Sequence, residues 1–353
     1  YLSSEKIILP KRQAFGHKGS YGHVLVVGGH TDMGGAVIMS AEAAFHAGAG
    51  KVSVVCHAKH HQAILARSPN IMVRDINALD EKTIQHLLTQ IDAVCFGMGL
   101  GRDEWAEQIY LGWFNLLNQN SHLEVVLDAD GLWFLAKHPK KLNPHLYATP
   151  HSGEAATLLG CTAADIEQDR IAAIYQLEQK YAGQWVLKGA GSLVLEAELF
   201  ICTQGNAGMG TGGMGDVLAG VIASLKAQFH EQVALHEIVS LHAQAGDLLA
   251  LGEWLWRCSM PLIAPIAALL ALPLAKVNPR QGRYLKLLPA ILLYISFVVF
   301  IGATRNSIEK GKLAAIALWA VHISYFGLAF LLLSWDSLVL RYQAWQQQRQ
   351  GAV

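Results

Sequence analysis

The sequence predicts a three-layer α/β domain with a mostly parallel sheet, followed by three transmembrane helices. From Val24 onward, short β-branched runs alternate with longer helical stretches, the pattern of a parallel sheet covered by helices on both faces. Turns rich in glycine or aspartate directly follow nearly all of these runs. The C-terminal part differs, because it contains long apolar spans without a charged residue, as membrane helices do.

Five strands are predicted, each a short run of β-branched or aromatic residues. They cover residues 24–27, 52–55, 93–96, 125–127 and 185–187. The turns that follow them lie at residues 28–29, 97–101, 128–131 and 188–192. Ligands of open α/β sheets bind beyond the carboxyl ends of the strands, so we expect these turns to converge on one crevice.

The distribution of charge predicts two differently built parts. Residues 1–252 contain 17 Lys and Arg against 24 Asp and Glu, a net charge of −7, whereas residues 253–353 contain 10 against 3, a net charge of +7. We therefore expect a boundary near residue 252, with the α/β domain over 1–252, a membrane segment over 253–342 and a polar tail over 343–353. The five cysteines show no CxxC or His-rich spacing, so neither a zinc site nor a disulfide framework is expected, and a reducing compartment fits best.

Three transmembrane spans are predicted at residues 258–275, 287–304 and 313–335. None of them contains Asp, Glu, Lys or Arg, and each is about long enough to cross the hydrocarbon core of a bilayer. Pro261, Pro265 and Pro273 lie in or beside the first span, where a membrane bundle tolerates kinks that damage an ordinary soluble helix. Buried helices of a large soluble protein are the alternative interpretation.

The segment most indicative of a catalytic site is residues 206–220, NAGMGTGGMGDVLAG. Gly212, Gly213 and Gly215 let the backbone approach a ligand closely, and the apolar run after Asp216 predicts a helix start. With Met214 they form an anion hole, because N–H groups at a helix start attract phosphate. Asp216 then lies where it could take a proton from a hydroxyl. A flexible loop that ends in an N-cap aspartate is the alternative.

The loop GTGGMGD followed by VLAG resembles the anion-hole and catalytic-aspartate loop of the ribokinase-like superfamily, and its flanks NAGM and DVLAG resemble the NAD(P)H-hydrate dehydratase branch. Further matches follow in the expected order: HKGSYGHVLVVGG, GAGKVSVV, GMGLGR, LDADGL, TPHSGEAATLLG and VLKGAGSLV. Together they cover nearly all of residues 14–250. The resemblance implies a ribokinase-like fold for the α/β domain.

The resemblance also implies an ADP-dependent dehydration that repairs the S-epimers of hydrated NADH and NADPH (NADHX and NADPHX). ADP phosphorylates the ring hydroxyl, and loss of phosphate gives NAD(P)H, AMP and phosphate. Asp216 is implied as the general base and as a substrate contact. The implied adenine-nucleotide contacts are Lys188, Gly189, Ala190, Gly191, Ser192 and Gly215. The implied substrate contacts are Ala36, Gly99, Gly101 and His151. ATP is less expected than ADP, and Mg²⁺ is expected without an assigned ligand.

Several of these residues have simpler interpretations. Lys188 follows a strand and could be its solvated end. His151 could belong to a helix start with Ser152 as the cap. Asp128 and Asp130 could assist a metal or nucleotide, yet an Asx turn explains them nearly as well. A small-molecule kinase of the same superfamily is the alternative enzyme.

The segment 256–342 resembles the last three transmembrane helices of the permease subunits that export lipopolysaccharide. LALPLAKVNPRQGRYLKLLPAILLY, RNSIEKGKL and ALWAVH carry the resemblance. The earlier helices and the periplasmic domain of such a permease are absent from the match, so the alternative function is an exporter-subunit fragment that carries a soluble domain.

The two resemblances conflict in topology. The positive-inside rule places the loop with Lys276, Arg280, Arg283 and Lys286 in the cytoplasm, but a cytoplasmic enzyme ahead of the first span places that loop outside. We therefore expect a chimera from misassembly, rearrangement or artificial joining, with a natural tethered enzyme as the alternative. The expected location is a cytoplasmic enzyme domain on a chain associated with the inner membrane. The expected partners are its substrates, a second copy of the soluble domain and exporter subunits, but no nucleic acid.

Overall fold

The computed structural model describes residue 7 and the ranges 9–12, 15–275 and 287–350. The chain divides into two compact units, Tyr1–Gln244 and Ala245–Val353. The sequence predicts a cytoplasmic loop between the first two spans from its basic residues. These residues, at 276–286, lie outside the described part of the chain.

The first unit is built on a nine-stranded sheet with the order β3-β2-β1-β4-β5-β6-β7-β8-β9. Strands β1 to β7 run parallel, whereas β8 and β9 add two antiparallel strands at one edge. The strands are β1 (His23–Val27), β2 (Lys51–Cys56), β3 (Met72–Asp75), β4 (Ala93–Phe96), β5 (Glu124–Leu127), β6 (Leu146–Ala148), β7 (Gln184–Leu187), β8 (Leu193–Leu195) and β9 (Leu199–Ile201). All five predicted strands are present.

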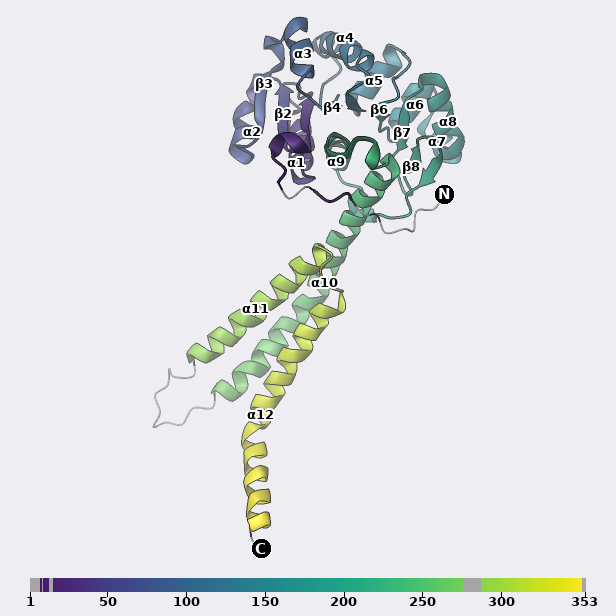
Figure 1. The fold of residues 1–353 in the computed structure, drawn as a ribbon. Coiled ribbons are helices and arrows are strands. Elements are labelled where there is room, and N and C mark those ends of the chain that lie inside the picture. The colour runs from purple at the N-terminus through teal and green to yellow at the C-terminus, as the bar shows by residue number, and fades with distance from the viewer. Residues whose placement is uncertain (1–6, 8, 13–14, 276–286, 351–353) are drawn as a thin grey trace. The chain divides into compact units, whose positions relative to one another are not determined.

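Helices cover both faces of the sheet (Figure 1), which gives the predicted three layers. One buried apolar cluster contains residues of α1 (Gly34–His46), α2 (His61–Arg67), α9 (Met214–Phe229) and the start of α10 (Leu235–Ala275). The other contains residues of α3 (Glu81–Leu88), α4 (Glu104–Gln119), α5 (Asp130–Lys137), α6 (Ser152–Leu159), α7 (Ala163–Gln168) and α8 (Arg170–Tyr181). In the strands other than the edge strand β3, alternating side chains belong to the two clusters, as a sheet buried on both faces requires.

Helix α9 packs closely on α1. A Cβ added at Gly220 would lie 2.2 Å from the Ser40 carbonyl oxygen, so the last glycine of the DVLAG motif permits this approach. The Ser40 hydroxyl also donates to the Asp216 carbonyl oxygen at 2.8 Å. These two contacts hold the first two turns of α9 against α1.

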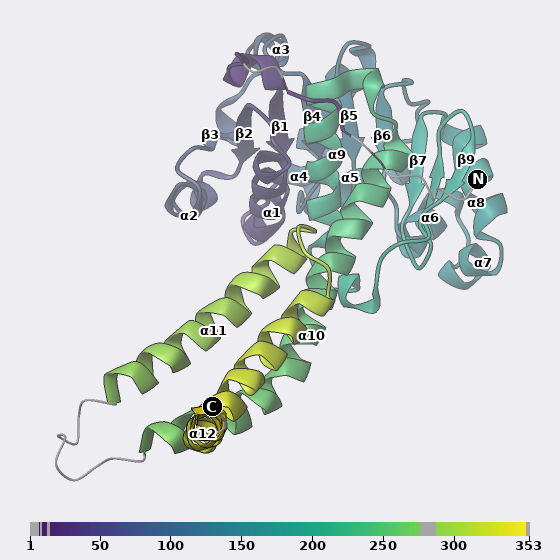
Figure 2. The ribbon, with the colours of Figure 1, turned by 60° about the horizontal axis from the view of Figure 1, so that its bottom comes forward.

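The second unit contains most of α10, together with α11 (Leu287–Glu309) and α12 (Ile316–Gln350), whose helical course is visible in Figure 2. By length and composition three described segments could cross a membrane: Leu235–Pro273, Leu288–Glu309 and Ile316–Trp335. The predicted three long apolar helices are therefore confirmed. The first helix begins earlier than the predicted span, and α12 continues past residue 343 into the segment predicted as a polar tail.

Gly97, at the end of β4, is required by its surroundings. Its φ is +110°, and an added Cβ would lie 2.4 Å from the Asp128 carbonyl oxygen. We expect Gly97→Ala to lower the free energy of unfolding of the first unit by about 2 to 4 kcal/mol, from backbone strain and the clash. Thermal unfolding of the full chain in detergent measures this loss.

The matched control is Gly112→Ala, since Gly112 lies within α4 with open space around an added Cβ. Alanine there should raise stability by about 0.5 to 1 kcal/mol. Equal stability of the two variants would contradict the close packing of the turn after β4 against the turn after β5.

Candidate active site

The turns after β1 and β4 are joined by backbone hydrogen bonds. Gly29 N–H donates to the Met98 carbonyl oxygen at 3.0 Å, and His30 N–H donates to the Gly99 carbonyl oxygen at 2.6 Å. A Cβ added at Gly99 would lie 3.1 Å from the Ala36 Cβ. The three predicted substrate contacts Ala36, Gly99 and Gly101 therefore lie together, with Ala36 supplied by the first turn of α1.

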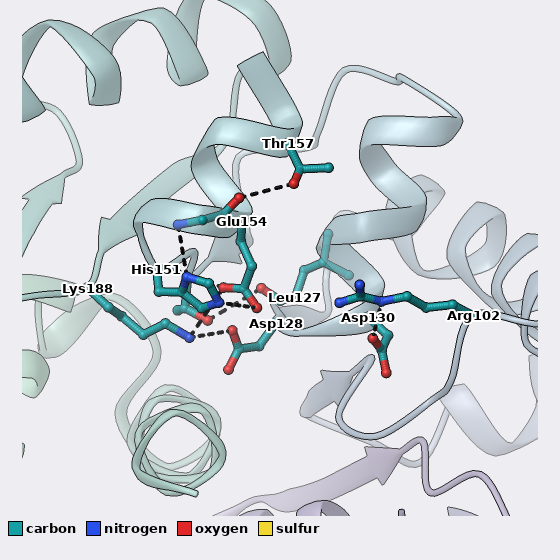
Figure 3. Close-up of polar contacts among 10 residues, drawn as sticks. Arg102, Leu127, Asp128, Asp130, His151, Glu154, Thr157 and Lys188 are labelled. Carbon is teal, nitrogen blue, oxygen red and sulfur yellow. Dashed lines mark hydrogen bonds and ion pairs between the residues drawn. The ribbon is translucent and has the colours of Figure 1, made fainter. Parts of the chain in front are cut away.

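A charged cluster lies beyond the ends of β5 and β7 (Figure 3). The Lys188 ammonium is 2.7 Å from Asp128 Oδ1 and 3.8 Å from Glu154 Oε2. The three side chains are 18%, 2% and 13% exposed, so Lys188 is a buried ion-pair partner rather than a solvated strand end. Asp128, for which the sequence left a ligand contact and an Asx turn as alternatives, is its nearest partner.

The start of α9 meets this cluster directly. A Cβ added at Gly215 would lie 3.1 Å from Lys188 Nζ and 3.4 Å from Asp128 Oδ2, so a glycine is suited to this contact. Gly213 is the N-cap residue with φ +92°, and Asp216 is the third residue of the helix. The alternative of an N-cap Asp216 is therefore wrong. Gly212 and Met214 flank Gly213 in the same turn. Met214 N–H makes a long hydrogen bond to the Thr211 carbonyl oxygen at 3.4 Å, and the other N–H groups of a first helical turn are available to an anion.

Asp216 lies within electrostatic reach of the same cluster. Burial, followed by the neighbouring Asp128 carboxylate, raises the pKa of Asp216 to about 6, while Lys188 acts against the rise. Burial also raises the pKa of Glu154. Burial alone would lower the pKa of Lys188, but Asp128 and Glu154 outweigh it and raise that pKa. A carboxylate with a pKa near neutrality can accept a proton at physiological pH.

His151 lies at the start of α6, beside the Lys188 turn. Lys188 N–H donates to the Pro150 carbonyl oxygen at 2.8 Å. His151 Nδ1 accepts from Gly153 N–H at 2.9 Å, and Glu154 accepts from His151 N–H at 2.8 Å. His151, and not Ser152, is thus the helix cap. Its ring is 61% exposed, which leaves it available to a ligand.

The turn 188–192 is held from behind by Arg170, which sequence analysis missed. The Arg170 guanidinium donates to the carbonyl oxygens of Leu187 at 3.1 Å, Ala190 at 2.8 Å and Gly191 at 3.1 Å. Ser192 donates to the Gly189 carbonyl oxygen at 3.2 Å. With its carbonyl groups tied inward, the turn can present N–H groups to a nucleotide.

The predicted site residues therefore meet at the carboxyl end of the parallel strands. The structure also adds Glu154, whose only sequence signal was its place in the TPHSGEAATLLG match, and Arg170, which had no signal. A hollow of about 430 Å³ lies at the opposite end of β5, beside Glu124 and His145, and shares no residue with this site.

Carboxylate oxygens are the ligands that Mg²⁺ prefers, and Mg²⁺ commonly binds through one or two carboxylates and substrate phosphates. Asp128 and Glu154 supply such oxygens beside Gly215. Two carboxylates fit a cation that takes its other ligands from nucleotide phosphates and water. Among the described residues no group of three or more His, Cys, Asp or Glu could hold a metal ion.

Comparison with known protein families gives two matches. The NAD(P)H-hydrate dehydratase family matches residues 24–266. The lipopolysaccharide export system permease LptF/LptG family matches residues 231–335. The chain therefore joins parts of two families, and both matches include residues 231–266, most of which belong to α10.

Three relatives illustrate the first match. The bifunctional NAD(P)H-hydrate repair enzyme Nnr of Coxiella burnetii is 42% identical over 69% of this chain and 49% of its own length. The Vibrio cholerae Nnr enzyme is 44% identical over 68% of this chain and 48% of its own length. The ADP-dependent (S)-NAD(P)H-hydrate dehydratase of Staphylococcus aureus is 33% identical over 71% of this chain and 90% of its own length. The chain thus spans about half the length of the bifunctional relatives.

Solved structures confirm the ribokinase-like fold. A ribokinase-like superfamily protein from Enterococcus faecalis has a TM-score of 0.61 and 32% identity, covering 69% of this chain and 84% of its own. The ADP/ATP-dependent NAD(P)H-hydrate dehydratase of Bacillus subtilis, co-crystallised with ATP and Mg²⁺, has a TM-score of 0.60 and 26% identity, covering 69% and 86%.

Proposed function

The chain belongs to the NAD(P)H-hydrate dehydratase family, and we propose that its first unit is an ADP-dependent dehydratase that repairs the S-epimers of NADHX and NADPHX. The observation that carries the proposal is the contact of Gly215, in the first turn of α9, with Lys188 and Asp128. It puts a helix start, a cation and the Asp216 carboxylate at one place, which is what phosphoryl transfer requires.

In the proposed reaction, Asp216 accepts the proton of the ring hydroxyl while that oxygen attacks the β-phosphorus of ADP. AMP leaves, and the phosphorylated ring then loses phosphate from one carbon and a proton from the neighbouring carbon, which restores the ring double bond and gives NAD(P)H. The N–H groups of residues 212–215 stabilise charge on the transferred phosphoryl group. Lys188 and the turn 189–192 bind the adenine nucleotide, and Ala36, Gly99, Gly101 and His151 face the hydrated dinucleotide.

Mg²⁺ bound to the nucleotide phosphates would offset their negative charge. Asp128 and Glu154 are the carboxylates that would hold it, directly or through water. Lys188 stays charged between these carboxylates, because they raise its pKa.

ADP as the donor and the S-epimer as the substrate are supported by the name of the Staphylococcus aureus relative. The Bacillus subtilis protein is named for both ADP and ATP, so the donor needs a direct test. The full chain in detergent is supplied with separated NADHX epimers and either ADP or ATP, while reduced nicotinamide, AMP and phosphate are measured. Accumulation of a phosphorylated product without release of phosphate would instead indicate a small-molecule kinase.

The raised pKa of Asp216 predicts the pH dependence of the reaction. A general base must be unprotonated, so kcat/KM for NADHX should fall about tenfold per pH unit below the pKa of about 6. The assay follows AMP formation with a blank without enzyme, because reduced nicotinamides decompose in acid. A constant kcat/KM down to about pH 4.5 would exclude Asp216 as the base, since its proton would already be bound.

For the second unit we propose insertion of α10 from Ala245 onward, together with α11 and α12, into the inner membrane with the enzyme in the cytoplasm. The apolar lengths and the permease match support this proposal. A function as an exporter-subunit fragment is the second candidate, favoured by the same match. The test is coexpression with exporter subunits followed by purification in detergent. Recovery of a complex would support this function, whereas recovery of the chain without any exporter subunit would oppose it. A homo-oligomer of the soluble unit remains a prediction.

A further inference from the structure

Arg102 directly follows the turn that carries Gly99 and Gly101. Its Nε donates to Asp130 Oδ1 at 2.8 Å, and its side chain is 55% exposed. Figure 3 shows the Arg102 and Asp130 pair at the same end of the sheet as Lys188 and Asp128. The outer nitrogens of a guanidinium held through Nε can donate to a second group.

Asp130 determines where Arg102 lies. Its carboxylate is 12% exposed, and its second oxygen accepts from Gly101 N–H at 2.9 Å. One buried carboxylate thus holds both the turn and the arginine beside it. An arginine fixed in this way loses little conformational freedom when it binds an anion.

The site is rich in carboxylates, so bound phosphates need cations beside them. Lys188 pairs with Asp128 and Glu154, and Arg102 pairs with Asp130. Asp216 adds a fourth carboxylate nearby. Two polyanions, ADP and the dinucleotide, must nevertheless bind there. Lys188 lies against Gly215 in the part assigned to the adenine nucleotide, and Arg102 lies beside the turn assigned to the dinucleotide.

We propose that Arg102, positioned by Asp130, binds the diphosphate group of the dinucleotide hydrate. This inference rests on the proposed function. The guanidinium fork matches phosphate oxygens in geometry and charge. Arg102 is a binding residue in this proposal, and Asp130 is a positioning residue.

The test compares Arg102→Gln with wild type, both as full chains in detergent, on two substrates. NADHX contains the diphosphate, and hydrated dihydronicotinamide riboside contains no phosphate. We expect the KM for NADHX to rise about 10- to 100-fold, as for loss of a charge-assisted hydrogen bond, with kcat changed less than about threefold. The KM for ADP and kcat/KM for the riboside should stay at wild-type values.

Arg67→Gln is a matched control. Arg67 is 62% exposed and pairs through a similar contact with Glu42, but it lies at the end of α2. The Arg67→Gln substitution should leave the KM for NADHX unchanged. Asp130→Asn should raise that KM, and the double variant with Arg102→Gln should be no worse than Arg102→Gln alone, because both changes remove one contact.

Equal losses on NADHX and on the riboside would overturn the proposal, since a structural role affects both substrates alike. An unchanged KM for NADHX would overturn it as well. Inactivity of the wild type with NADHX would instead count against the proposed function. In that case fluorescence titration with NADH, which carries the same diphosphate, decides the inference: weaker binding by Arg102→Gln supports it, and equal binding overturns it.

Discussion

Asp216→Asn is expected to lower kcat for ADP-dependent recovery of NADH by about 10³-fold or more, because the ring hydroxyl loses its proton acceptor. The KM for ADP should change little, since Asp216 is not assigned to the nucleotide. Rates of NADH and AMP formation by the full chain measure both quantities. Activity of the variant within about tenfold of wild type would remove Asp216 from the mechanism.

The same substitution is expected to raise stability. The folded pKa of about 6 lies above the ordinary aspartate pKa of 3.8 expected in the unfolded chain, so ionised Asp216 costs stability at pH values above its folded pKa. With allowance for partial exposure, Asp216→Asn should raise the free energy of unfolding by about 1 to 2 kcal/mol at pH 7. The gain should shrink as the pH falls below 6 and vanish below 3.8, where aspartate is neutral in both states.

Asp165→Asn is the control for helix position. Asp165 is also the third residue of its helix, α7, but hydrogen bonds from Thr162 lower its pKa. Its charge therefore contributes stability at neutral pH, so the control should lose stability and keep activity. Stabilisation by both variants would point to a general effect of removing charge from helix starts.

Lys188→Met has the second largest expected effect. It leaves Asp128 and Glu154, both nearly buried, without their cation. Removing one partner of a buried ion pair costs about 3 to 5 kcal/mol, and the KM for ADP should rise at least about tenfold with the loss of the charged contact. Thermal unfolding and ADP kinetics of the full chain measure these two losses.

Two further variants separate charge from packing. The double variant Asp128→Asn with Lys188→Met should recover much of the lost stability, because the unpaired charge is gone, but none of the ADP affinity. Lys226→Met removes another buried lysine, which donates to the Val233 carbonyl oxygen at 3.0 Å, and should leave the KM for ADP unchanged. An ADP defect in Lys226→Met equal to that of Lys188→Met would refute the nucleotide-binding role.

Sequence predicted the central sheet well, because β1, β2, β4, β5 and β7 are apolar runs followed by turns. The four missed strands have local reasons. β3 reads MVRD and alternates exposed with half-buried residues, as an edge strand does. β6, β8 and β9 contain three residues each, too few to show a period of two.

The turns of the site could be predicted because glycine spacing and strand ends are local features. The partners of those turns could not, because they depend on distant contacts. Asp128 and Lys188 are 60 positions apart, and Arg170 reaches the carbonyl groups of the 188–192 turn from a neighbouring helix start. The alternative of a Ser152 cap is wrong because the ring nitrogen of His151 accepts the capping hydrogen bond instead.

The most direct test of the account is the reaction of the full chain with separated NADHX epimers and ADP. We expect the S-epimer alone to give NADH, with AMP and phosphate formed in equal amounts, and Asp216→Asn to form neither. Nucleotide-independent recovery of NADH, or equal rates in wild type and variant, would contradict it.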